Sequence, residues 1–238
     1  MRALLVVLLM LSLATAALGQ SLLFMDDFDD GVFDGWHHFS VVEAGYDFWF
    51  QGGELWGRSS SLNDCGHCPG CDGIALIDDL IVGDIALEVK VTNRNSCGLI
   101  CLFLRVTEPY YSSHDDADRW VVIFDPGTSI YEIAAQQGAG WIPGCQIIDS
   151  FSFGVNVPHY FRVELVGHTM TLWHRLLPTD DYELLNTLTC AAGSDAGYAG
   201  LRVCSSGKHV SFDDYTLYDL GASPAVQGTW STVKALYR

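Results

Sequence analysis

The sequence predicts an all-β protein, a two-sheet antiparallel jelly-roll sandwich. Val, Ile, Tyr, Phe, Trp and Thr are concentrated in short runs, and Gly, Asp, Asn and Pro separate these runs. The runs recur at the short intervals that are typical of sandwiches and jelly rolls. No helical periodicity extends beyond a turn or two before residue 220. These observations favour two packed sheets over a helical or mixed architecture.

The predicted strands cover most of the chain between residues 22 and 218. We expect the first of them, which leads into an acidic and aromatic stretch, to lie beside the last and to close the sandwich. In chain order the predicted strands are Leu22–Phe28, Tyr46–Gln51, Glu54–Arg58, Ile74–Ile77, Asp84–Thr92, Gly98–Val106, Arg119–Phe124, Ile130–Ala134, Tyr160–Val166, Thr169–His174, Glu183–Thr189, Gly200–Cys204 and Val210–Tyr218.

Two of these segments show the period-two alternation of a strand with one face on a core. In Asp84–Val91 and in Tyr160–Val166, large apolar residues occupy every second position, and charged or smaller residues lie between them. The second segment continues into Thr169–Leu172 through Gly167-His168. We therefore expect a hairpin that turns at Gly167-His168.

The amino terminus has the pattern of a signal peptide. Met1-Arg2 precedes the apolar run Ala3–Leu13, and Ala17-Leu18-Gly19 is an acceptable cleavage site before Gln20. The run is shorter than the roughly 20 residues of a membrane-spanning helix, so we expect a secreted protein, extracellular or periplasmic, with no membrane span in the mature chain. The predicted organisation is a signal peptide over residues 1–19, a jelly-roll domain over 20–220 and a tail over 221–238 that is a short helix or disordered.

Charge and composition narrow the classes of partner. The formal net charge is −17, which argues against nucleic acid and anionic membranes because both require basic surfaces. A hydrophobic content of 49% argues against disorder. The acidic net charge is compatible with binding to cations or to neutral sugars.

The eight cysteines predict disulfides, because their even number follows a signal peptide. Many pairings are open, and the sequence does not choose among them. Cys190 and Cys204 flank a Gly-rich turn, so one hypothesis joins them across adjacent strands.

The segment Cys65–Cys71 allows three interpretations. Its Cys-Gly-His-Cys tetrapeptide matches disulfide isomerases, but Pro69-Gly70 follows and no βαβ pattern surrounds it. Three cysteines and His67 suit Zn²⁺ chemically, although an oxidising compartment disfavours such a site. We favour a disulfide-stapled loop that reaches Cys97, Cys101 or Cys145.

An ordered series of motifs spans about residues 24–220. It consists of Asp27-Phe28-Asp29-Asp30-Gly31 with Gly35-Trp36, Phe48–Leu55, Asp84–Val89, the hairpin Tyr160–Leu172, and Gly200-Leu201 leading into Val210–Tyr215. In order and spacing this series resembles the concanavalin A-like lectin and glucanase jelly-roll superfamily, and specifically its LamG-like and 3-keto-disaccharide-hydrolase-like secreted branch. The resemblance implies the fold and frequent glycan binding, but not one activity.

The acidic opening predicts a structural Ca²⁺ site. Carboxylate oxygens close to a turn glycine suit this hard cation. In similar jelly-roll modules Ca²⁺ lies where the first and last strands meet, so the resemblance points to Asp27 or Asp29 together with Asp213 or Asp214. The alternative is a solvated acidic turn.

Aromatic side chains are the best candidates for ligand contacts, because a flat ring with a polar edge stacks on a sugar face. Tyr110, Tyr111, Trp120 and Trp141 are the predicted ligand-binding residues. Trp36, Trp49, Trp56 and Trp173 are expected in the core, since a sandwich must fill the space between its sheets.

Catalysis has weaker support. The Glu-x-Asp-x-x-Glu motif of the glucanase branch is absent, as is Gly-x-Ser-x-Gly. His114, Asp115 and Asp116 lie in a polar segment that is suited to acid–base chemistry but is typical of a solvated loop. The sequence therefore favours a secreted, non-catalytic module that binds carbohydrate or a cell-surface polymer. The alternatives are a glycosidase-like hydrolase of keto-disaccharide type, and a structural or adhesive protein without a small ligand.

Overall fold

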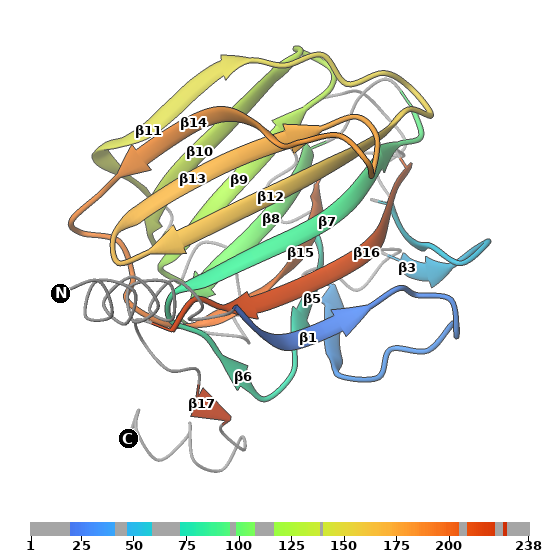
Figure 1. The fold of residues 1–238 in the computed structure, drawn as a ribbon, viewed down its shortest axis with the longest axis horizontal. Helices are drawn as coiled ribbons and strands as arrows, with labels where there is room; N and C mark the ends of the chain where they lie inside the picture. Colours follow the sequence, from blue (N-terminus) through green and yellow to red (C-terminus); the bar gives the residue numbers. More distant parts are fainter. Residues whose placement is uncertain are drawn as a thin grey trace, which may run out of the picture.

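Two antiparallel sheets, one of eight strands and one of seven, lie face to face (Figure 1). The computed structural model describes residues 20–40, 47–58, 72–95, 99–107, 117–138, 140–204, 209–221 and 226–227. The signal peptide predicted over 1–19 lies outside this described part. The predicted two-sheet antiparallel sandwich is confirmed.

The eight-stranded sheet contains both ends of the predicted closure. β1 (Ser21–Asp26) pairs antiparallel with β16 (His209–Asp219), from Ser21 opposite Asp219 to Asp26 opposite Tyr215. The first strand therefore lies beside the last long strand, as predicted. The main path of the sheet is β14 (Glu183–Thr189), β13 (Thr169–Arg175), β12 (Pro158–Val166), β7 (Ile85–Asn93), β16, β4 (Leu55–Arg58) and β3 (Asp47–Phe50).

The seven-stranded sheet forms the second layer. Its order is β11 (Gly140–Ser150), β10 (Ile130–Gln137), β9 (Arg119–Asp125), β8 (Leu99–Val106), β15 (Tyr198–Cys204), β5 (Asp72–Ile77) and β2 (Trp36–Ser40). β6 (Leu80–Ile81) and β17 (Val226–Gln227) pair with each other as a separate two-stranded sheet. β17 falls in the predicted tail, and residues 228–238 of that tail lie outside the described residues.

β7 and β12 form because their alternation matches the pleat of a sheet. Leu87 and Val163 point into the core and are fully buried, whereas Glu88 and Arg162 on the other face are only partly buried. β12 and β13 are joined at Gly167-His168, with Val166 opposite Thr169. The predicted hairpin is confirmed at its predicted turn.

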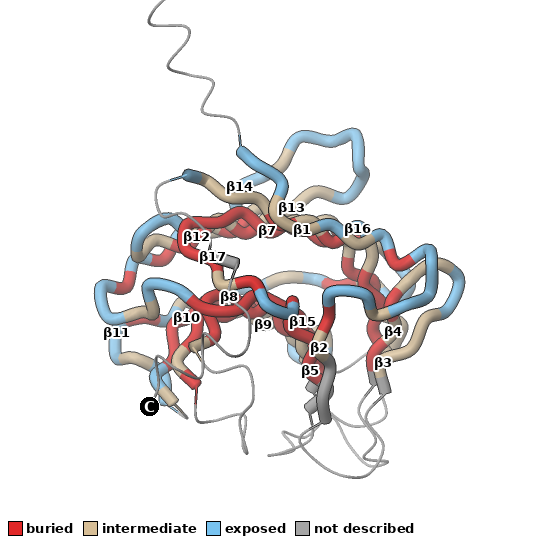
Figure 2. Tube along the Cα trace, turned by 90° about the horizontal axis from the view of Figure 1, so that it is seen from below, coloured by how far each residue is buried: buried red, intermediate tan, exposed pale blue. Residues whose placement is uncertain are grey.

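The main core lies between the sheets, where buried residues are concentrated in Figure 2. Phe124 from the seven-stranded sheet meets Phe161 from the eight-stranded sheet with ring centroids 4.2 Å apart. Both rings are shielded from solvent. Burial of such rings supplies a large part of the hydrophobic stabilisation of a sandwich.

A second apolar cluster lies on the outer face of the seven-stranded sheet. Ile74, Phe103 and Val121 are at most 1% exposed, although their neighbours along the same strands point into the main core. β8 is consequently buried on both faces, as its nearly continuous apolar sequence requires. The described apolar side chains at the centre of this outer face are therefore buried.

β11 and β2 were not among the predicted strands. β11 contains Pro143 and Gly144, which normally indicate a turn, and it is tolerated because it is an edge strand with a register shift in its pairing. β2 contains adjacent histidines and lies at the opposite edge. Within the described residues, no helix has the length and apolar character needed to cross a membrane.

Candidate functional site

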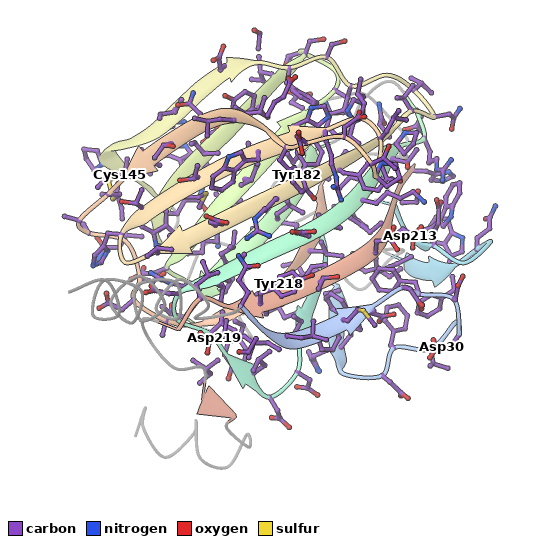
Figure 3. The ribbon with its side chains drawn as sticks, viewed as in Figure 1. Asp30, Cys145, Tyr182, Asp213, Tyr218 and Asp219 are labelled. Atoms are coloured by element: carbon purple, nitrogen blue, oxygen red, sulfur yellow. A yellow bond between two sulfur atoms is a disulfide. The ribbon has the colours of Figure 1, made fainter. Side chains whose placement is uncertain are left out.

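The outer face of the eight-stranded sheet, which points away from the other sheet, carries aromatic and charged side chains from one side to the other. Tyr182 and Asp213 are labelled over this sheet in Figure 3. Strand register places the side chains in two adjacent rows across the strands. One row contains Trp49, Trp56, Ser211, Thr92 and Pro158, and the next contains Asp213, Lys90, Tyr160 and Arg175.

Trp49 and Trp56 form a tryptophan pair on the hairpin of β3 and β4. They oppose each other in the register, and their ring centroids lie 5.9 Å apart at 36°. Both indole N–H groups are fixed by Gln51, from Trp49 to the side-chain oxygen at 3.3 Å and from Trp56 to the backbone oxygen at 3.0 Å. Both rings are partly exposed, so the pair combines a fixed orientation with access from solvent.

The turn of this hairpin explains why the pair is held in place. Gly52 and Gly53 both have positive φ, a conformation that favours glycine. A Cβ on Gly53 would lie 2.3 Å from a carboxylate oxygen of Asp29. The acidic segment after β1 thus packs directly against the turn that presents the tryptophans.

A network of alternating charges borders the tryptophan pair. Arg94 forms an ion pair with Glu54, donates to Ser211 Oγ at 2.9 Å, and has its guanidinium carbon 4.7 Å from the centre of the Trp56 ring. Lys90 Nζ lies 2.5 Å from Asp213 Oδ2 and 3.4 Å from Glu54 Oε1. The Trp56 ring is therefore stacked on a cation whose charge is balanced by a neighbouring carboxylate.

Burial and ion pairing shift the pKa values of Asp213 and Lys90 in this network. Burial raises the pKa of the Asp213 carboxyl, and Lys90 opposes that effect. Burial lowers the pKa of Lys90, but the carboxylates of Asp213 and Glu54 together raise it by more. The pKa of Lys90 is therefore above its ordinary value. Lys90 therefore remains charged at neutral pH and keeps the two carboxylates in position.

A second cluster lies on the same face over β12 and β13. Arg162 forms ion pairs with Glu88 and with Glu164. The guanidinium carbon of Arg175 lies 4.2 Å from the ring centre of Tyr182 and 5.6 Å from that of Tyr160. Burial, reinforced by the carboxylate of Glu88, raises the pKa of Tyr182 to about 12, so its phenol stays neutral. This face can thus stack on a flat ligand and hydrogen-bond to hydroxyl or acidic groups.

Comparison with known proteins identifies the architecture. No protein family matches the sequence, and no curated protein matches it. Among solved structures, the carbohydrate-binding module CBM66 from Bacillus subtilis shares 15% identity over 78% of this chain and 96% of its own, with a TM-score of 0.55. The Bacillus licheniformis β-glucanase shares 14% identity over 85% of this chain and 99% of its own, with a TM-score of 0.58. The VIP36 exoplasmic/lumenal domain with Ca²⁺ and Man3GlcNAc shares 11% identity over 86% of this chain and 92% of its own, with a TM-score of 0.59.

The fold is a concanavalin A-like jelly roll. The resemblance seen in the sequence is confirmed at the level of the fold. The LamG-like and keto-disaccharide-hydrolase-like branch stays a prediction, because identities of 11–15% carry no information on branch or activity.

The jelly roll does not bring the four predicted calcium ligands into one site. Asp27 and Asp29 are exposed, Asp214 is exposed, and the Asp213 carboxylate is paired with Lys90. An oxygen of Asp27 accepts the backbone N–H of Asp29 at 3.2 Å, as in a solvated Asx turn. Among the described residues, no three His, Cys, Asp or Glu side chains gather closely enough to hold a metal ion. Calcium binding at Asp27 or Asp29 with Asp213 or Asp214 therefore stays a prediction.

The four aromatic residues that were predicted to contact a ligand differ in where the structure places them. Trp120 is fully buried, and its indole N–H donates to the Ser194 carbonyl at 3.1 Å, so the prediction that it contacts a ligand is wrong. Trp141 is 39% exposed on the edge strand β11, away from the tryptophan pair, and its ligand contact stays a prediction. Tyr110 and Tyr111 lie outside the described residues.

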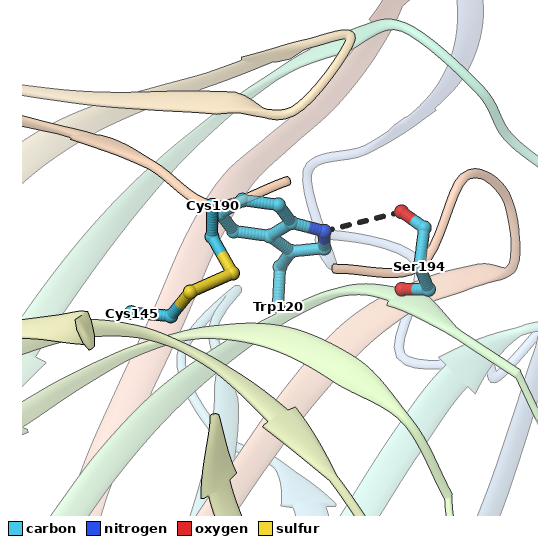
Figure 4. The surroundings of a disulfide bond; sticks show 4 residues. All are labelled: Trp120, Cys145, Cys190 and Ser194. Carbon is cyan, nitrogen blue, oxygen red and sulfur yellow. Dashed lines mark hydrogen bonds between the residues drawn. A yellow bond between two sulfur atoms is a disulfide. The ribbon is translucent and has the colours of Figure 1, made fainter. Parts of the chain in front are cut away.

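The predicted pairing of Cys190 with Cys204 is wrong, because Cys190 is bonded to Cys145 (Figure 4). The bond joins the edge strand β11 to the end of β14, while Cys204 ends β15 within the seven-stranded sheet. It also removes Cys145 from the partners proposed for the Cys65–Cys71 loop, which itself lies outside the described residues.

Trp36 is buried, as predicted, but Trp49, Trp56 and Trp173 are only partly buried, so assigning these three to the core was wrong. The signal for Trp49 and Trp56 was present in the alternation. Phe48 and Phe50 pack against the core, which turns Trp49 outward, and the two-stranded register places Trp56 beside it.

Proposed function

We propose that this protein is a secreted, non-catalytic module that binds carbohydrate or a surface polymer on the outer face of its eight-stranded sheet. The tryptophan pair, Trp49 and Trp56, is the contact surface. Its secretion is supported by the signal-peptide pattern and by the disulfide between Cys145 and Cys190.

The single observation that carries the proposal is a partly exposed pair of indoles, fixed by Gln51 and bordered by charged groups. A sugar presents an apolar face and a rim of hydroxyls. The rings suit the face, and Glu54, Arg94 and Asp213 offer acceptors and donors for hydroxyls. Because these groups are already held by one another, little side-chain entropy is lost on binding.

Binding to immobilised polysaccharides and a glycan array tests the proposal with Trp49→Ala and Trp56→Ala. Trp141→Ala tests the predicted contact on β11, and Ile148→Ala, at an exposed position of the same strand, is the control. We expect the first two variants to weaken binding about tenfold or more, as for central interface aromatics, and Ile148→Ala to bind like the wild type. Loss of binding in Trp141→Ala alone would move the site to β11. A protein that binds no glycan would favour the structural or adhesive alternative. Repeating the titration with a chelator tests the predicted calcium requirement.

Glycoside hydrolysis is a second candidate, favoured by one observation. Oxygens of Glu54 and Asp213 lie 3.4 and 2.5 Å from Lys90 Nζ, so they are at most about 6 Å apart, an upper limit that includes the roughly 5–5.5 Å spacing of a retaining carboxylate pair. Release of reducing sugar that is lost in Glu54→Gln and in Asp213→Asn would establish this activity. Binding without turnover would leave the non-catalytic proposal in place.

A further inference from the structure

Arg175 differs from the other cationic side chains described on the outer face of the eight-stranded sheet. Arg94, Lys90 and Arg162 each form an ion pair with at least one carboxylate. Among the described residues, no carboxylate lies within ion-pairing distance of Arg175. Its hydrogen bond goes to a neutral acceptor, from Nη1 to the Asp180 carbonyl at 3.4 Å.

The surroundings of Arg175 hold the guanidinium in place without neutralising it. The ring centres of Tyr182 and Tyr160 lie 4.2 and 5.6 Å from its central carbon. Its Nε is buried and has no hydrogen-bond partner. A buried donor without a partner costs free energy, and the Nη groups, which are not among the buried unpaired atoms, are the part of the guanidinium that a ligand on this face would meet. The fork of N–H groups on arginine matches the two oxygens of a carboxylate.

Trp173 supplies a ring beside this cation. It lies two residues before Arg175 on β13, so both side chains point to the same face. Trp173 opposes Arg162 in the register, and its ring is partly exposed. The arrangement of indole, two phenols and an uncompensated guanidinium is suited to a sugar ring that carries an acidic group.

Strand order connects this cluster to the tryptophan pair. β3, β4, β16, β7, β12 and β13 are consecutive neighbours, so Trp49 and Arg175 are separated by five strand spacings, roughly 24 Å. The rows that contain them are adjacent in register. One oligosaccharide of several units, lying across the strands, would reach both clusters.

We propose that Arg175 binds the carboxylate of an acidic sugar unit, so that the ligand of this face is a uronic-acid-containing polysaccharide. This inference rests on the proposed function, since it extends the same sheet face. The net charge of −17 opposes an acidic polymer at long range. At about 0.15 M salt the Debye length is roughly 8 Å, so distant carboxylates are screened while a direct contact with Arg175 is not.

Three carboxylates in this region are already engaged by other groups. Those of Glu88 and Glu164 are paired with Arg162, and that of Asp180 accepts the Leu177 backbone N–H at 3.1 Å. Glu183 lies close enough to His174 to influence its pKa. Among the described cations of this face, Arg175 is the one without a paired carboxylate.

The test measures binding of oligomers of galacturonate, glucuronate and mannuronate at 0.15 M salt, each beside its methyl ester. The ester keeps the sugar face and removes the charge. We expect at least one acidic oligomer to bind about ten- to a hundredfold more tightly than its ester. Arg175→Gln should abolish that difference, and Arg175→Lys should restore only part of it. Thermal melts confirm that each variant is folded.

Three outcomes would overturn the assignment: equal binding of acid and ester by the wild type, binding of neutral or sulfated glycans alone, or an acid preference that survives in Arg175→Gln. Each of these leaves the proposed function intact if Trp49→Ala and Trp56→Ala still weaken binding. If those two variants bind every oligomer as the wild type does, the proposed function fails instead.

Discussion

Arg105 and Asp84 form an ion pair between the two sheets, with Arg105 Nη2 2.7 Å from Asp84 Oδ1 and both side chains at most 6% exposed. Arg105 belongs to β8, and Asp84 directly precedes β7. The guanidinium also donates to the carbonyls of Gly83 at 2.9 Å and Ser194 at 3.2 Å. One buried cation thus ties together loops from both layers.

Asp84→Asn should lower the free energy of unfolding by about 3–5 kcal/mol, because it leaves the Arg105 charge buried without a counter-ion. Chemical denaturation measures the effect. Asp181 is exposed, so Asp181→Asn is the control and should change stability by less than about 0.5 kcal/mol. A loss of under about 1 kcal/mol in Asp84→Asn would contradict the prediction.

A pair of histidines should make stability depend on pH. His159 Nδ1 and His174 Nε2 lie 2.9 Å apart, in contact with the rings of Phe151 and Phe161. Burial, with a smaller effect of charge on His174, lowers the pKa of His159 to about 4. Burial also lowers the pKa of His174, and Glu183 opposes it. Both rings are therefore neutral in the folded protein at pH 7.

The sign of the pH effect follows from these directions. Between about pH 6.5 and pH 4 the two histidines bind protons in the unfolded state but stay neutral in the folded state. Their contribution to the free energy of unfolding is therefore fully present above about pH 6.5 and decreases as the pH falls. For His159 the total loss is roughly 3 kcal/mol. Denaturation midpoints of the wild type and of His159→Phe, compared at each pH, isolate this contribution from other groups. Parallel profiles for the two proteins would show that His159 titrates normally.

Much of the fold was predictable because it rests on local patterns. The alternation in β7 and β12 and the Gly167-His168 turn specify strands, faces and register without distant information. β11 was not predicted because Pro143 and Gly144 usually mark a turn in the local sequence. A strand can contain them here because β11 lies at the edge of its sheet.

The candidate site was less predictable because it depends on pairing between distant strands. Trp49 and Trp56 are close in sequence, but Lys90 and Asp213 are separated by 123 residues and meet only through the pairing of β7 with β16. Trp120 was misplaced for a related reason. A tryptophan at the start of a strand has no local mark that distinguishes a ligand contact from a core residue.

The disulfide should contribute substantially to stability. Cys145 and Cys190 are 45 residues apart and join the edges of the two sheets. Closing a loop of this length in the unfolded chain corresponds to about 4 kcal/mol in the chain-entropy description. The double variant Cys145→Ser, Cys190→Ser should lose stability of this order, measured by denaturation under non-reducing conditions. A double variant as stable as the wild type would show that the bond adds little beyond the packing at this edge.

Gly193 should be intolerant of a methyl group because the buried indole of Trp120 occupies the space. A Cβ on Gly193 would lie 2.3 Å from Trp120 Cζ2, and the ring is fixed by its hydrogen bond to Ser194. Gly193→Ala should therefore lower the free energy of unfolding by about 1–3 kcal/mol and alter the near-ultraviolet circular dichroism of tryptophan. Gly140→Ala is the matched control, since its nearest neighbour would be the Gln137 carbonyl at 3.7 Å. That control should be neutral or slightly stabilising, and equal effects of the two substitutions would contradict the packing argument.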